Sequence, residues 1–386
     1  MEIRSDERFA VLRSIGEECI YEDGLCLLLK KKRDPICYVW FEPSPVMDIE
    51  QGILKTIYVN KMVTAGCVVK ILMADWFLQR HPKIGSNLNK IRTIGSYNIA
   101  MWKAAGMYVD KVDIKWLSDE LNHHALDYWP LAMDVSRKYT VKRMASYSSY
   151  MPPYGPGRLP AAEIIHPCMQ VAAILCQKAD VWLFSKDQRE IIMLAKDYCD
   201  DIYKGNKPTI LLHRVLPNLL EDPDFEDKRD PGRTIFMLDE EDDVNEKINS
   251  AFCPPRIALY NPCLEYIKSL VFPWFGKLEV VRKEGNNKIF SSMEELIVGY
   301  KSGDLDSVDV KLALQKAIND ILELVGEFFR SNVEAQALIT ARKVHLFLNL
   351  QLLFTTIIYY VGTYIYATAA TAAEIDLLNF KFRIMR

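Results

Sequence analysis

Several features that would assign this sequence to a specialised class are absent from it. The 386 residues carry 48 basic and 51 acidic side chains, so the net charge of −3 does not predict a nucleic-acid-binding surface, although a local basic patch is compatible with it. The nine cysteines show no CxxC or other zinc spacing, which favours reduced thiols and no metal site. There is also no P-loop, no GxGxxG motif and no convincing Ser-His-Asp order.

The amino-terminal stretch MEIRSDERFAVLRSIGEE is too charged for a secretory signal and too acidic for a transit peptide, so we expect a cytoplasmic protein. The neighbouring His123 and His124 lie in a helical pattern, where capping or solvent exposure is a simpler role than metal binding. Half of the residues are apolar and 26% are charged, as in globular proteins, and the length allows two domains of roughly 100–200 residues each.

Up to about residue 240, strand and helix patterns alternate. The apolar, aromatic segment 35–42 predicts a buried strand, apolar residues at helical spacing over 49–62 predict a helix, and 67–77 again has a strand pattern. A strand–helix–strand unit of this kind indicates a parallel sheet and an α/β domain. Two further strands are expected at 179–184 and 208–216, with a helix between them.

Beyond about residue 240 the strand patterns fade, and four successive helices are expected before residue 331. Ser292 and Glu295 form a predicted capping box at the start of the third. Two segments rich in Pro, Gly or charged residues, 147–160 and 221–233, are predicted loops. We therefore predict a mostly helical domain over 241–340.

Residues 341–386 form an apolar tail. No charged side chain occurs from Val344 to Ala373, and this run is longer than the about 20 residues that span a bilayer. Two interpretations stay open: a membrane anchor, which the flanking Arg342 and Lys343 would suit, and an artefact of gene prediction in which non-coding sequence is read as protein. Under either interpretation we expect residues 1–340 to fold without the tail.

A series of sequence blocks resembles one enzyme family over roughly residues 5–340. The blocks CYVWFEPSPVMDIEQG, ADWF, LDYWPLAMD, HPCMQ, KDQREIIMLAKDYC, LPNLLEDPDFEDKRDPGRTIFMLDEEDDVNEKI, CPP and NPCLEYIK follow the order and spacing of eukaryotic, above all plant, tyrosyl-tRNA synthetases. The resemblance implies a class I, dimeric α/β protein with a Rossmann-like catalytic-type domain (1–240) and an α-helical anticodon-binding-type domain (241–340). It also implies a ligase that activates tyrosine with ATP and Mg and transfers it to tRNA.

The first ATP signature of that family is altered in this chain. The family has a glycine where this chain has Trp40, and a histidine that steadies the phosphates where it has Asp48. Glu50 replaces a small residue two positions later. A carboxylate close to a phosphate repels it by about 4 kcal/mol at an effective dielectric of 20, whereas about 1.4 kcal/mol already changes a rate ten-fold.

The second signature, Lys-Met-Ser-Lys-Ser in the family, falls on a degenerate segment. Its positions hold, in order, Phe225, Glu226, Asp227, Lys228 and Arg229. Lys228 and Arg229 are candidate catalytic residues only if the chain is active. A solvated, charged loop without a catalytic role explains the same composition.

The tyrosine pocket implied by the resemblance is only partly retained. Tyr38, Gln170 and Gln188 match positions that meet the substrate phenol and surround its amino group, although the glutamines could equally be polar residues at helix starts. The family's second tyrosine is His166, and the aspartate that accepts the phenolic proton is Ala173. Loss of this acceptor should weaken tyrosine binding and its selection over phenylalanine, because that selectivity depends on pairing the hydroxyl.

In the helical domain, Asp309 matches a family residue that faces the anticodon. The aromatic residue that stacks on an anticodon base is replaced by Glu284, and a nearby histidine is replaced by Asp306. Base stacking contributes about 1–3 kcal/mol, which a carboxylate cannot supply, so binding of tRNA is expected to be weakened.

Because the losses fall on functional positions, our leading hypothesis is a degenerate, non-catalytic copy that pairs with an active tyrosine–tRNA ligase. Some family members join an active and a degenerate copy in one polypeptide. Such a chain would bind tyrosine and ATP poorly and form a homodimer or a heterodimer, to which the block LDYWPLAMDVSRK would contribute. The alternatives are a divergent but active ligase that uses ATP with Mg, and a decayed gene product. A membrane is a partner only if the run at 344–373 is genuine.

Overall fold

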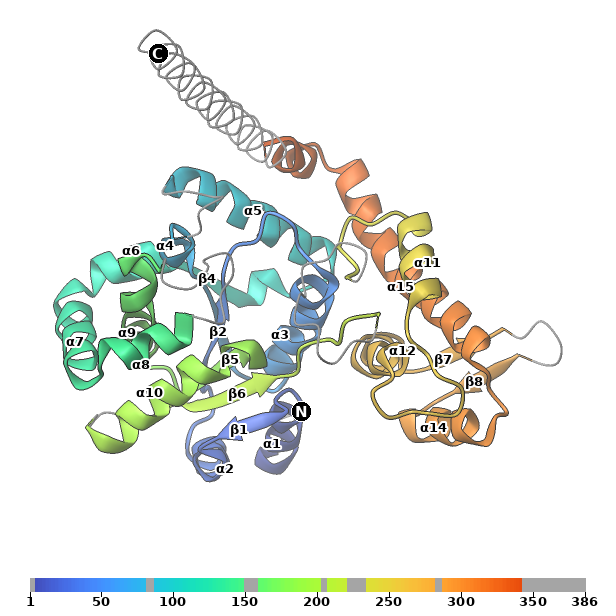
Figure 1. Ribbon diagram of the computed structural model, residues 1–386, viewed down its shortest axis with the longest axis horizontal. Helices are drawn as coiled ribbons and strands as arrows, with labels where there is room; N and C mark the ends of the chain where they lie inside the picture. The colour runs from blue at the N-terminus through green and yellow to red at the C-terminus, as the bar shows by residue number, and fades with distance from the viewer. Residues whose placement is uncertain are drawn as a thin grey trace, which may run out of the picture.

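The computed structural model describes residues 4–80, 87–148, 159–202, 207–220, 234–281 and 287–341. A sheet with helices on both faces and a mainly helical part lie side by side in it (Figure 1). Residues 342–386 of the apolar tail, the second signature at 225–229 and Glu284 fall outside the described residues. No helix in the described ranges has the length and hydropathy needed to cross a bilayer.

A six-stranded sheet with the strand order β1-β6-β5-β2-β3-β4 forms the first part. β1 pairs antiparallel with β6, and every other neighbouring pair in the sheet is parallel. The strands are β1 (Glu18–Ile20), β2 (Ile36–Phe41), β3 (Val68–Met73), β4 (Val112–Trp116), β5 (Val181–Ser185) and β6 (Thr209–His213). This sheet confirms the predicted α/β class with a parallel core.

The central strand β2 is buried on both faces, as expected when helices cover a parallel sheet on both sides. Successive side chains of a strand point to opposite faces, so Cys37, Val39 and Phe41 enter one hydrophobic core, whereas Tyr38 and Trp40 enter another. The first core continues into the helical part of the molecule, while the second lies between the sheet and helices of the first part.

Ten α-helices and three short helical turns are described in the first part. They are α1 (Ser5–Arg13), α2 (Glu22–Lys31), η1 (Glu50–Leu54), α3 (Lys55–Thr64), α4 (Asp75–Leu78), α5 (Leu88–Ala104), η2 (Val109–Lys111), α6 (Leu117–His123), α7 (Ala125–Lys138), α8 (Val141–Ser148), α9 (Ala161–Cys176), η3 (Lys186–Gln188) and α10 (Arg189–Asp201). The predicted helix over 49–62 is therefore present as η1 followed by α3.

The second part is mainly helical, as expected, but it also contains an unpredicted hairpin of β7 (Leu278–Val280) and β8 (Lys288–Phe290). Its helices are α11 (Glu241–Ser250), α12 (Pro262–Tyr266), η4 (Ile267–Val271), α13 (Phe272–Phe275), α14 (Met293–Ser302) and α15 (Ser307–Ser331). Half of the predicted capping box is present, because Ser292 Oγ accepts a hydrogen bond from the Glu295 amide at 3.2 Å. The Glu295 carboxylate accepts from the Ser291 amide instead.

The strand expected over 67–77 was predicted too long. It ends at Met73, and α4 begins at Asp75. The Asp75 carboxylate accepts hydrogen bonds from the amides of Trp76 at 2.8 Å and Ser118 at 2.9 Å, which favours a turn into a helix over continued pairing. The short strands β1 and β4 were missed because neither has a clear apolar pattern.

Gly52 brings η1 into close contact with the segment that follows the second signature. A Cβ atom at this position would lie 2.2 Å from Met237 Sδ. The same segment is held to the entry of η1 by two backbone hydrogen bonds, from the Met237 amide to the Met47 carbonyl at 3.0 Å and from the Ile49 amide to the Ile235 carbonyl at 2.9 Å.

We predict that Gly52→Ala lowers the free energy of unfolding by about 1–3 kcal/mol, because the added methyl group overpacks a closed contact. Urea titration monitored by circular dichroism measures the change. Gly24→Ala is the matched control, since the nearest atom to its new Cβ lies at 3.7 Å, and it should be neutral or stabilising by up to about 1 kcal/mol. Equal destabilisation by the two substitutions would contradict the assignment of Gly52 as a close-packing position.

Candidate functional site

The chain order of the parallel strands reverses at β2, with β3 and β4 on one side and β5 and β6 on the other. Open α/β sheets bind ligands beyond the carboxyl ends of the strands at such a reversal. β2 ends at Phe41 and β5 at Ser185, so the candidate site is formed by residues 42–50, by η3 and by the side chains beneath them.

Asp48 caps the helix that leaves this edge of the sheet. Its Oδ1 accepts a hydrogen bond from the Gln51 amide at 2.7 Å, and Gln51 Oε1 accepts one from the Asp48 amide at 3.3 Å. This reciprocal pairing satisfies backbone donors that a helix leaves open at its start. Burial raises the pKa of the Asp48 carboxyl to about 6. The residue in the expected phosphate position is thus an acid with a structural role.

Glu50 is the second acid at the site, and its carboxylate is held by β5 and by the segment after β6. Oε2 accepts a hydrogen bond from the Leu216 amide at 2.7 Å, and Oε1 lies 3.5 Å from Ser185 Oγ. Burial, and then the charge of Asp48, raise the pKa of Glu50 to about 8. Glu50 therefore holds its proton through neutral pH, while Asp48 is largely ionised there.

Lys55 is the cation whose charge acts on both acids. It is buried, burial lowers its pKa, and its Nζ lies 3.5 Å from the Trp40 carbonyl oxygen. Asp187 adds a further negative charge to the environment of the two acids. These described residues do not fit the triphosphate of ATP, which needs a surplus of positive charge and of amide donors.

Aromatic rings fill the space directly beneath this end of the sheet. Trp40 is 2% exposed, and its ring centroid lies 5.7 Å from that of Phe77, 5.8 Å from that of Phe184 and 6.3 Å from that of Trp182. The Tyr38 ring lies 4.9 Å from Trp182. The indole of Trp40 thus occupies a closed cluster at the position where the resemblance implies a glycine.

Three predicted pocket residues lie on one face of α9, at the spacing of successive helical turns. His166, Gln170 and Ala173 are all buried, and Ala173 joins the same hydrophobic core as Tyr38 and Trp40. The His166 ring meets the edge of Phe77 at 4.9 Å, and burial, together with the charge of a nearby arginine, lowers its pKa well below the usual value. His166 is therefore a neutral, packed side chain.

Several polar atoms around this cluster find no hydrogen-bond partner among the described residues. They are both amide atoms of Gln170, Nε2 of His166, and Nε1 of Trp40 and Trp182. An unsatisfied buried polar atom costs about 1–3 kcal/mol, so apolar packing alone does not account for their retention. These polar atoms lie around the aromatic cluster of Trp40, Phe77, Trp182 and Phe184.

The remaining predicted residues are spread over the molecule. Gln188 is half-buried and lies immediately before α10, without a capping hydrogen bond from its side chain. Asp309 is half-buried in the first turn of α15, where its amide donates to Asp306 Oδ1 at 2.8 Å. Asp306 therefore caps this helix. The positions Phe225, Glu226, Asp227, Lys228 and Arg229 lie outside the described residues, and their roles stay predictions.

No group of three or more His, Cys, Asp or Glu side chains in the described ranges could hold a metal ion. His124 Nε2 lies 3.8 Å from Glu120, a pairing of neighbouring helical turns at the surface.

The sequence interpretation missed Trp182, Phe184 and Lys55 as site residues. Trp182 and Phe184 alternate along β5 and so share one face, a period-two signal that was available in the segment ADVWLF. No comparable signal marked Lys55, because a lysine on a predicted helix is normally exposed.

We predict that Glu50→Gln flattens the dependence of stability on pH. A carboxyl whose pKa is higher in the folded protein than its ordinary value of 4.5 stabilises the fold fully below that value, and the contribution is lost as the pH rises towards about 8. Over this window the variant should lose less stability than the native chain, by up to about 1.4 kcal/mol per pH unit.

Urea titrations at a series of pH values measure this difference, with the exposed Glu246→Gln as matched control. A smaller slope from Asp48 should remain in the Glu50 variant. Parallel curves for the native chain and Glu50→Gln would show that Glu50 is ionised and solvated in the fold.

The comparisons with known proteins agree with this architecture. Residues 30–323 match the family of tRNA synthetases class I (W and Y). The chain is 46% identical over 342 residues to tyrosine–tRNA ligase 1, cytoplasmic, of Arabidopsis thaliana, which covers 88% of this chain and 89% of that protein. It is also 46% identical over 340 residues to tyrosine–tRNA ligase 2, cytoplasmic, of the same plant, but spans only 46% of that protein.

Solved structures show the same fold. The tyrosyl-tRNA synthetase of Leishmania major in complex with tyrosinol superposes with a TM-score of 0.82 at 37% identity, over 89% of this chain and 53% of the other. The tyrosyl-tRNA synthetase of Aeropyrum pernix gives a TM-score of 0.77 at 25% identity, over 88% of this chain and 99% of the other.

Proposed function

This chain belongs to the class I tyrosyl-tRNA synthetase family, and we propose that within the family it is a non-catalytic copy that pairs with an active tyrosine–tRNA ligase. The observation that carries the proposal is the pair of acids at the end of β2. Asp48 caps a helix, and Glu50 accepts from the Leu216 amide, so both carboxylates are fixed by the fold. Activation of tyrosine places a polyphosphate where these groups lie. The ionised carboxylate of Asp48 repels it, and the protonated Glu50 brings no positive charge to offset that repulsion.

The packing beneath the acids supports the further inference that tyrosine is not bound there. The Trp40 ring is enclosed by Phe77, Phe184 and Trp182, and Ala173 provides no acceptor for a phenolic proton. To admit a substrate ring, the cluster would have to open and expose apolar surface, at a cost of about 25 cal/mol per Å². We infer that the chain neither selects tyrosine nor forms its adenylate.

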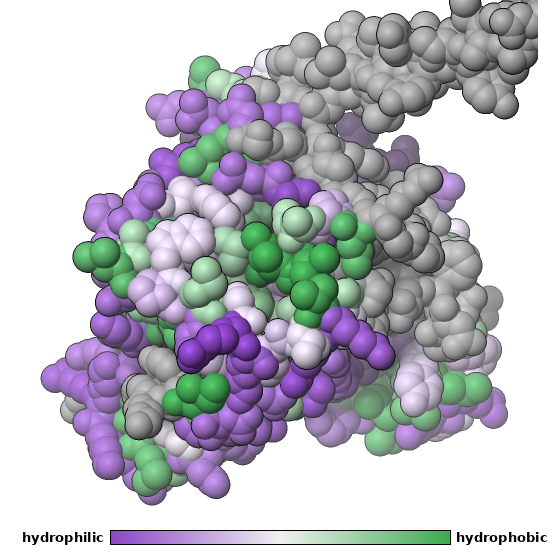
Figure 2. All heavy atoms as spheres, turned by 60° about the vertical axis from the view of Figure 1, so that its left-hand side comes forward, coloured by the Kyte–Doolittle hydropathy of each residue, from purple (hydrophilic) through white to green (hydrophobic). Residues whose placement is uncertain are grey.

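The surface of α7 supports the pairing. Leu126, Trp129 and Met133 recur at helical spacing and are 91%, 50% and 71% exposed, whereas Tyr128, Ala132 and Val135 of the same helix are buried. Figure 2, which brings this side of the molecule forward, shows hydrophobic side chains gathered within a hydrophilic surround. Contiguous exposed apolar side chains rimmed by polar residues mark protein–protein interfaces. The proposed occupant is a second chain of the same family, either a copy of this one or an active ligase.

Two relatives support a paired arrangement through their length. This chain spans 46% of one Arabidopsis ligase and 53% of the Leishmania synthetase, so each of these relatives has room for a further unit of similar size. The relatives from Arabidopsis are named as cytoplasmic, and we propose the same location for this chain. Binding of tRNA would be weak, since Asp306 has become a helix cap.

One observation favours the competing function of a divergent, active ligase. The amide of Gln170 lies at a position that would meet the substrate amino group, and neither of its polar atoms has a partner among the described residues. The 46% identity with chains named as tyrosine–tRNA ligases is consistent with this function too. In that case Lys228 and Arg229 would act on ATP.

We predict that the purified chain gives no tyrosine-dependent ATP–pyrophosphate exchange above background, because the ionised Asp48 repels the polyphosphate and no described cation beside it supplies a surplus of positive charge. An active tyrosine–tRNA ligase assayed in parallel is the positive control, and Lys228→Ala distinguishes genuine activity from contamination. Robust exchange that disappears in Lys228→Ala would overturn the proposal and establish the active ligase.

We also predict a dimer at micromolar concentration, either of this chain alone or with an active synthetase, that depends on the exposed face of α7. The double substitution Leu126→Asp and Met133→Asp should raise the dimer dissociation constant by on the order of ten-fold or more, about 1.4 kcal/mol, because it places charge in an apolar interface. Sedimentation velocity measures the shift.

The control is Val298→Asp on α14, which is 69% exposed and should leave association unchanged. Thermal unfolding should show both proteins folded, since the substituted side chains are at the surface. Association that is insensitive to the α7 substitutions would place the interface elsewhere, and a monomer that binds no active synthetase would refute the pairing.

A further inference from the structure

A cavity of about 340 Å³ lies at the face of the sheet that bears the second hydrophobic core. Three lysines line it, each from a different segment: Lys70 of β3, Lys115 of β4 and Lys178, which follows α9. Tyr38 of β2 lines it too, directly beside Lys70 in the register of the sheet. None of residues 42–50 takes part, so the cavity is distinct from the candidate site beyond β2.

Lys70 brings a charge to this cavity that no described carboxylate neutralises in an ion pair. Its Nζ lies 5.6 Å from the centre of the Tyr38 ring, and the side chain is half-buried. Among the described residues, this contact with an aromatic ring is the interaction that holds the ammonium group. A ring face accepts no conventional hydrogen bond, so the donors of Lys70 remain available to a ligand.

The other two lysines of the cavity are only loosely held. Lys115 Nζ lies 3.3 Å from Asp113, whose side chain is 47% exposed. Lys178 Nζ lies 3.9 Å from Asp127, whose side chain is 64% exposed. Ion pairs at such exposed positions contribute little to stability, because water and salt screen them. Both ammonium groups can therefore turn towards an anion in the cavity at little cost.

Two neutral groups add hydrogen-bond donors to the lining. Gln177 lines the cavity, and its Nε2 is buried without a hydrogen-bond partner among the described residues. Burial, and then the charges of Glu120 and Asp113, raise the pKa of Tyr38, so its hydroxyl keeps its proton and can donate. An oxygen-rich ligand would satisfy donors that the described part of the chain leaves open.

The backbone at Lys178 gives independent support. This residue has a φ of 50°, in the left-handed region, just beyond the end of α9. Glycine is the usual residue at such a helix end, since a side chain there is strained. The stability of the helix end therefore does not explain a lysine at this position, whereas a charge required at the cavity does.

The cavity also has one acidic lining residue, Glu120. Its carboxylate lies 3.8 Å from Nε2 of His124, which lines the cavity as well. The three ammonium groups outnumber this single carboxylate. The lining as a whole thus favours an anion.

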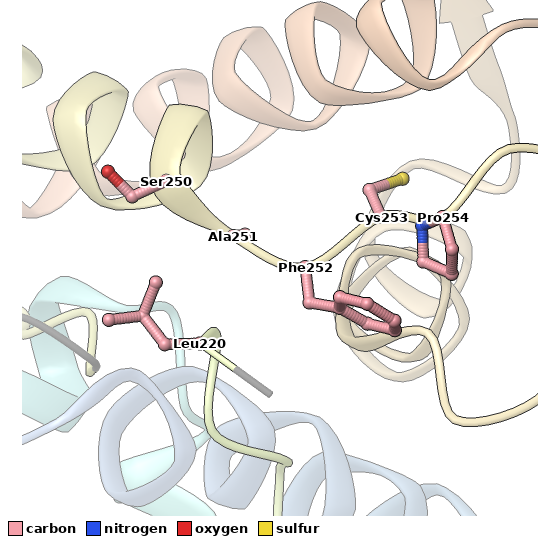
Figure 3. Close-up of a pocket in the computed structure, with 6 residues that line it drawn as sticks. All are labelled: Leu220, Ser250, Ala251, Phe252, Cys253 and Pro254. Atoms are coloured by element: carbon pink, nitrogen blue, oxygen red, sulfur yellow. The ribbon is translucent and has the colours of Figure 1, made fainter. Parts of the chain in front are cut away.

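A second cavity shows that a hollow of this size does not by itself have this character. It measures about 380 Å³ and lies between the segment 250–254 and Leu220 (Figure 3). None of its described lining residues is charged. The concentration of cations is therefore particular to the cavity beside Tyr38.

We propose that this cavity binds a small molecule with a phosphate group, which Lys70, Lys115 and Lys178 hold while Gln177 and Tyr38 donate hydrogen bonds to its oxygens. Ammonium groups bind phosphate as point charges. A phosphate suits three cations better than a carboxylate does, because it carries close to two negative charges at neutral pH and more acceptor oxygens. The volume lies within the range of small-molecule sites. This inference goes beyond the proposed function and does not depend on it.

The test measures how inorganic phosphate protects single lysines of the full chain from acetylation. The reaction is run at about pH 8 with about 10 mM phosphate, against sodium chloride of equal ionic strength, and chymotryptic peptides are quantified by mass spectrometry. Acetylation of Lys70 should slow on the order of two-fold or more, as occupancy of the cavity requires. Lys111 is the internal control, because its Nζ also lies over a tyrosine ring, 5.2 Å from the centre of Tyr108, but it does not line the cavity.

A pair of variants tests whether the protection comes from this site. In Lys70→Met, which keeps the length of the side chain and removes its charge, phosphate should no longer protect Lys178. In Lys111→Met the protection of Lys178 should persist. Thermal unfolding establishes that both variants are folded.

Three results would overturn the proposal. They are unchanged acetylation of Lys70 in phosphate, equal protection of Lys70 and Lys111, and protection of Lys70 by the same concentration of tyrosine but not by phosphate. The last result would assign the cavity to an amino acid. The measurement on the native chain decides the question even if Lys70→Met does not fold.

Discussion

Strand β2 is buried on both faces, and the two hydrophobic cores on either side of the sheet are built against it. Alternate side chains of this strand enter two different cores, and residue 40 enters the second of them. The identity of residue 40 therefore determines what lies beneath the carboxyl ends of the strands. A glycine there leaves room for a ligand, whereas Trp40 adds a large ring that Phe77, Trp182 and Phe184 enclose. One side chain thus adds to the second core at the position where the resemblance implies a glycine.

The two acids above this core, Asp48 and Glu50, also occupy groups that a ligand could otherwise use. A helix start with open amides is suited to bind a phosphate, but a carboxylate can satisfy the same donors from within the chain. Asp48 does so through Gln51, and Glu50 reaches across to the Leu216 amide. Burial raises the pKa of both acids, and backbone amide hydrogen bonds, followed by the charge of Lys55, partly offset this rise.

Sequence patterns predicted the parallel sheet, the helical second half and the main elements around the site. They did so because the spacing of apolar residues along a strand or a helix reflects which of its faces the fold buries. They failed where burial was partial or the element short, as in β1, β4 and the β7–β8 hairpin. They also predicted β3 too long, because its end depends on the Asp75 carboxylate, which accepts a hydrogen bond from the Trp76 amide. The altered positions 40, 48 and 50 were recognised through the resemblance. The enclosure of Trp40 and the burial of Lys55 were not, since they depend on contacts between segments far apart in the sequence.

We propose that side chains of this chain occupy the positions where tyrosine and ATP would bind. Equilibrium dialysis of labelled tyrosine, and separately of labelled ATP with Mg, against the purified chain tests it most directly, with an active tyrosine–tRNA ligase dialysed in parallel. We expect no saturable binding of either molecule to this chain at concentrations that saturate the ligase. Stoichiometric binding of tyrosine or ATP at those concentrations would contradict it.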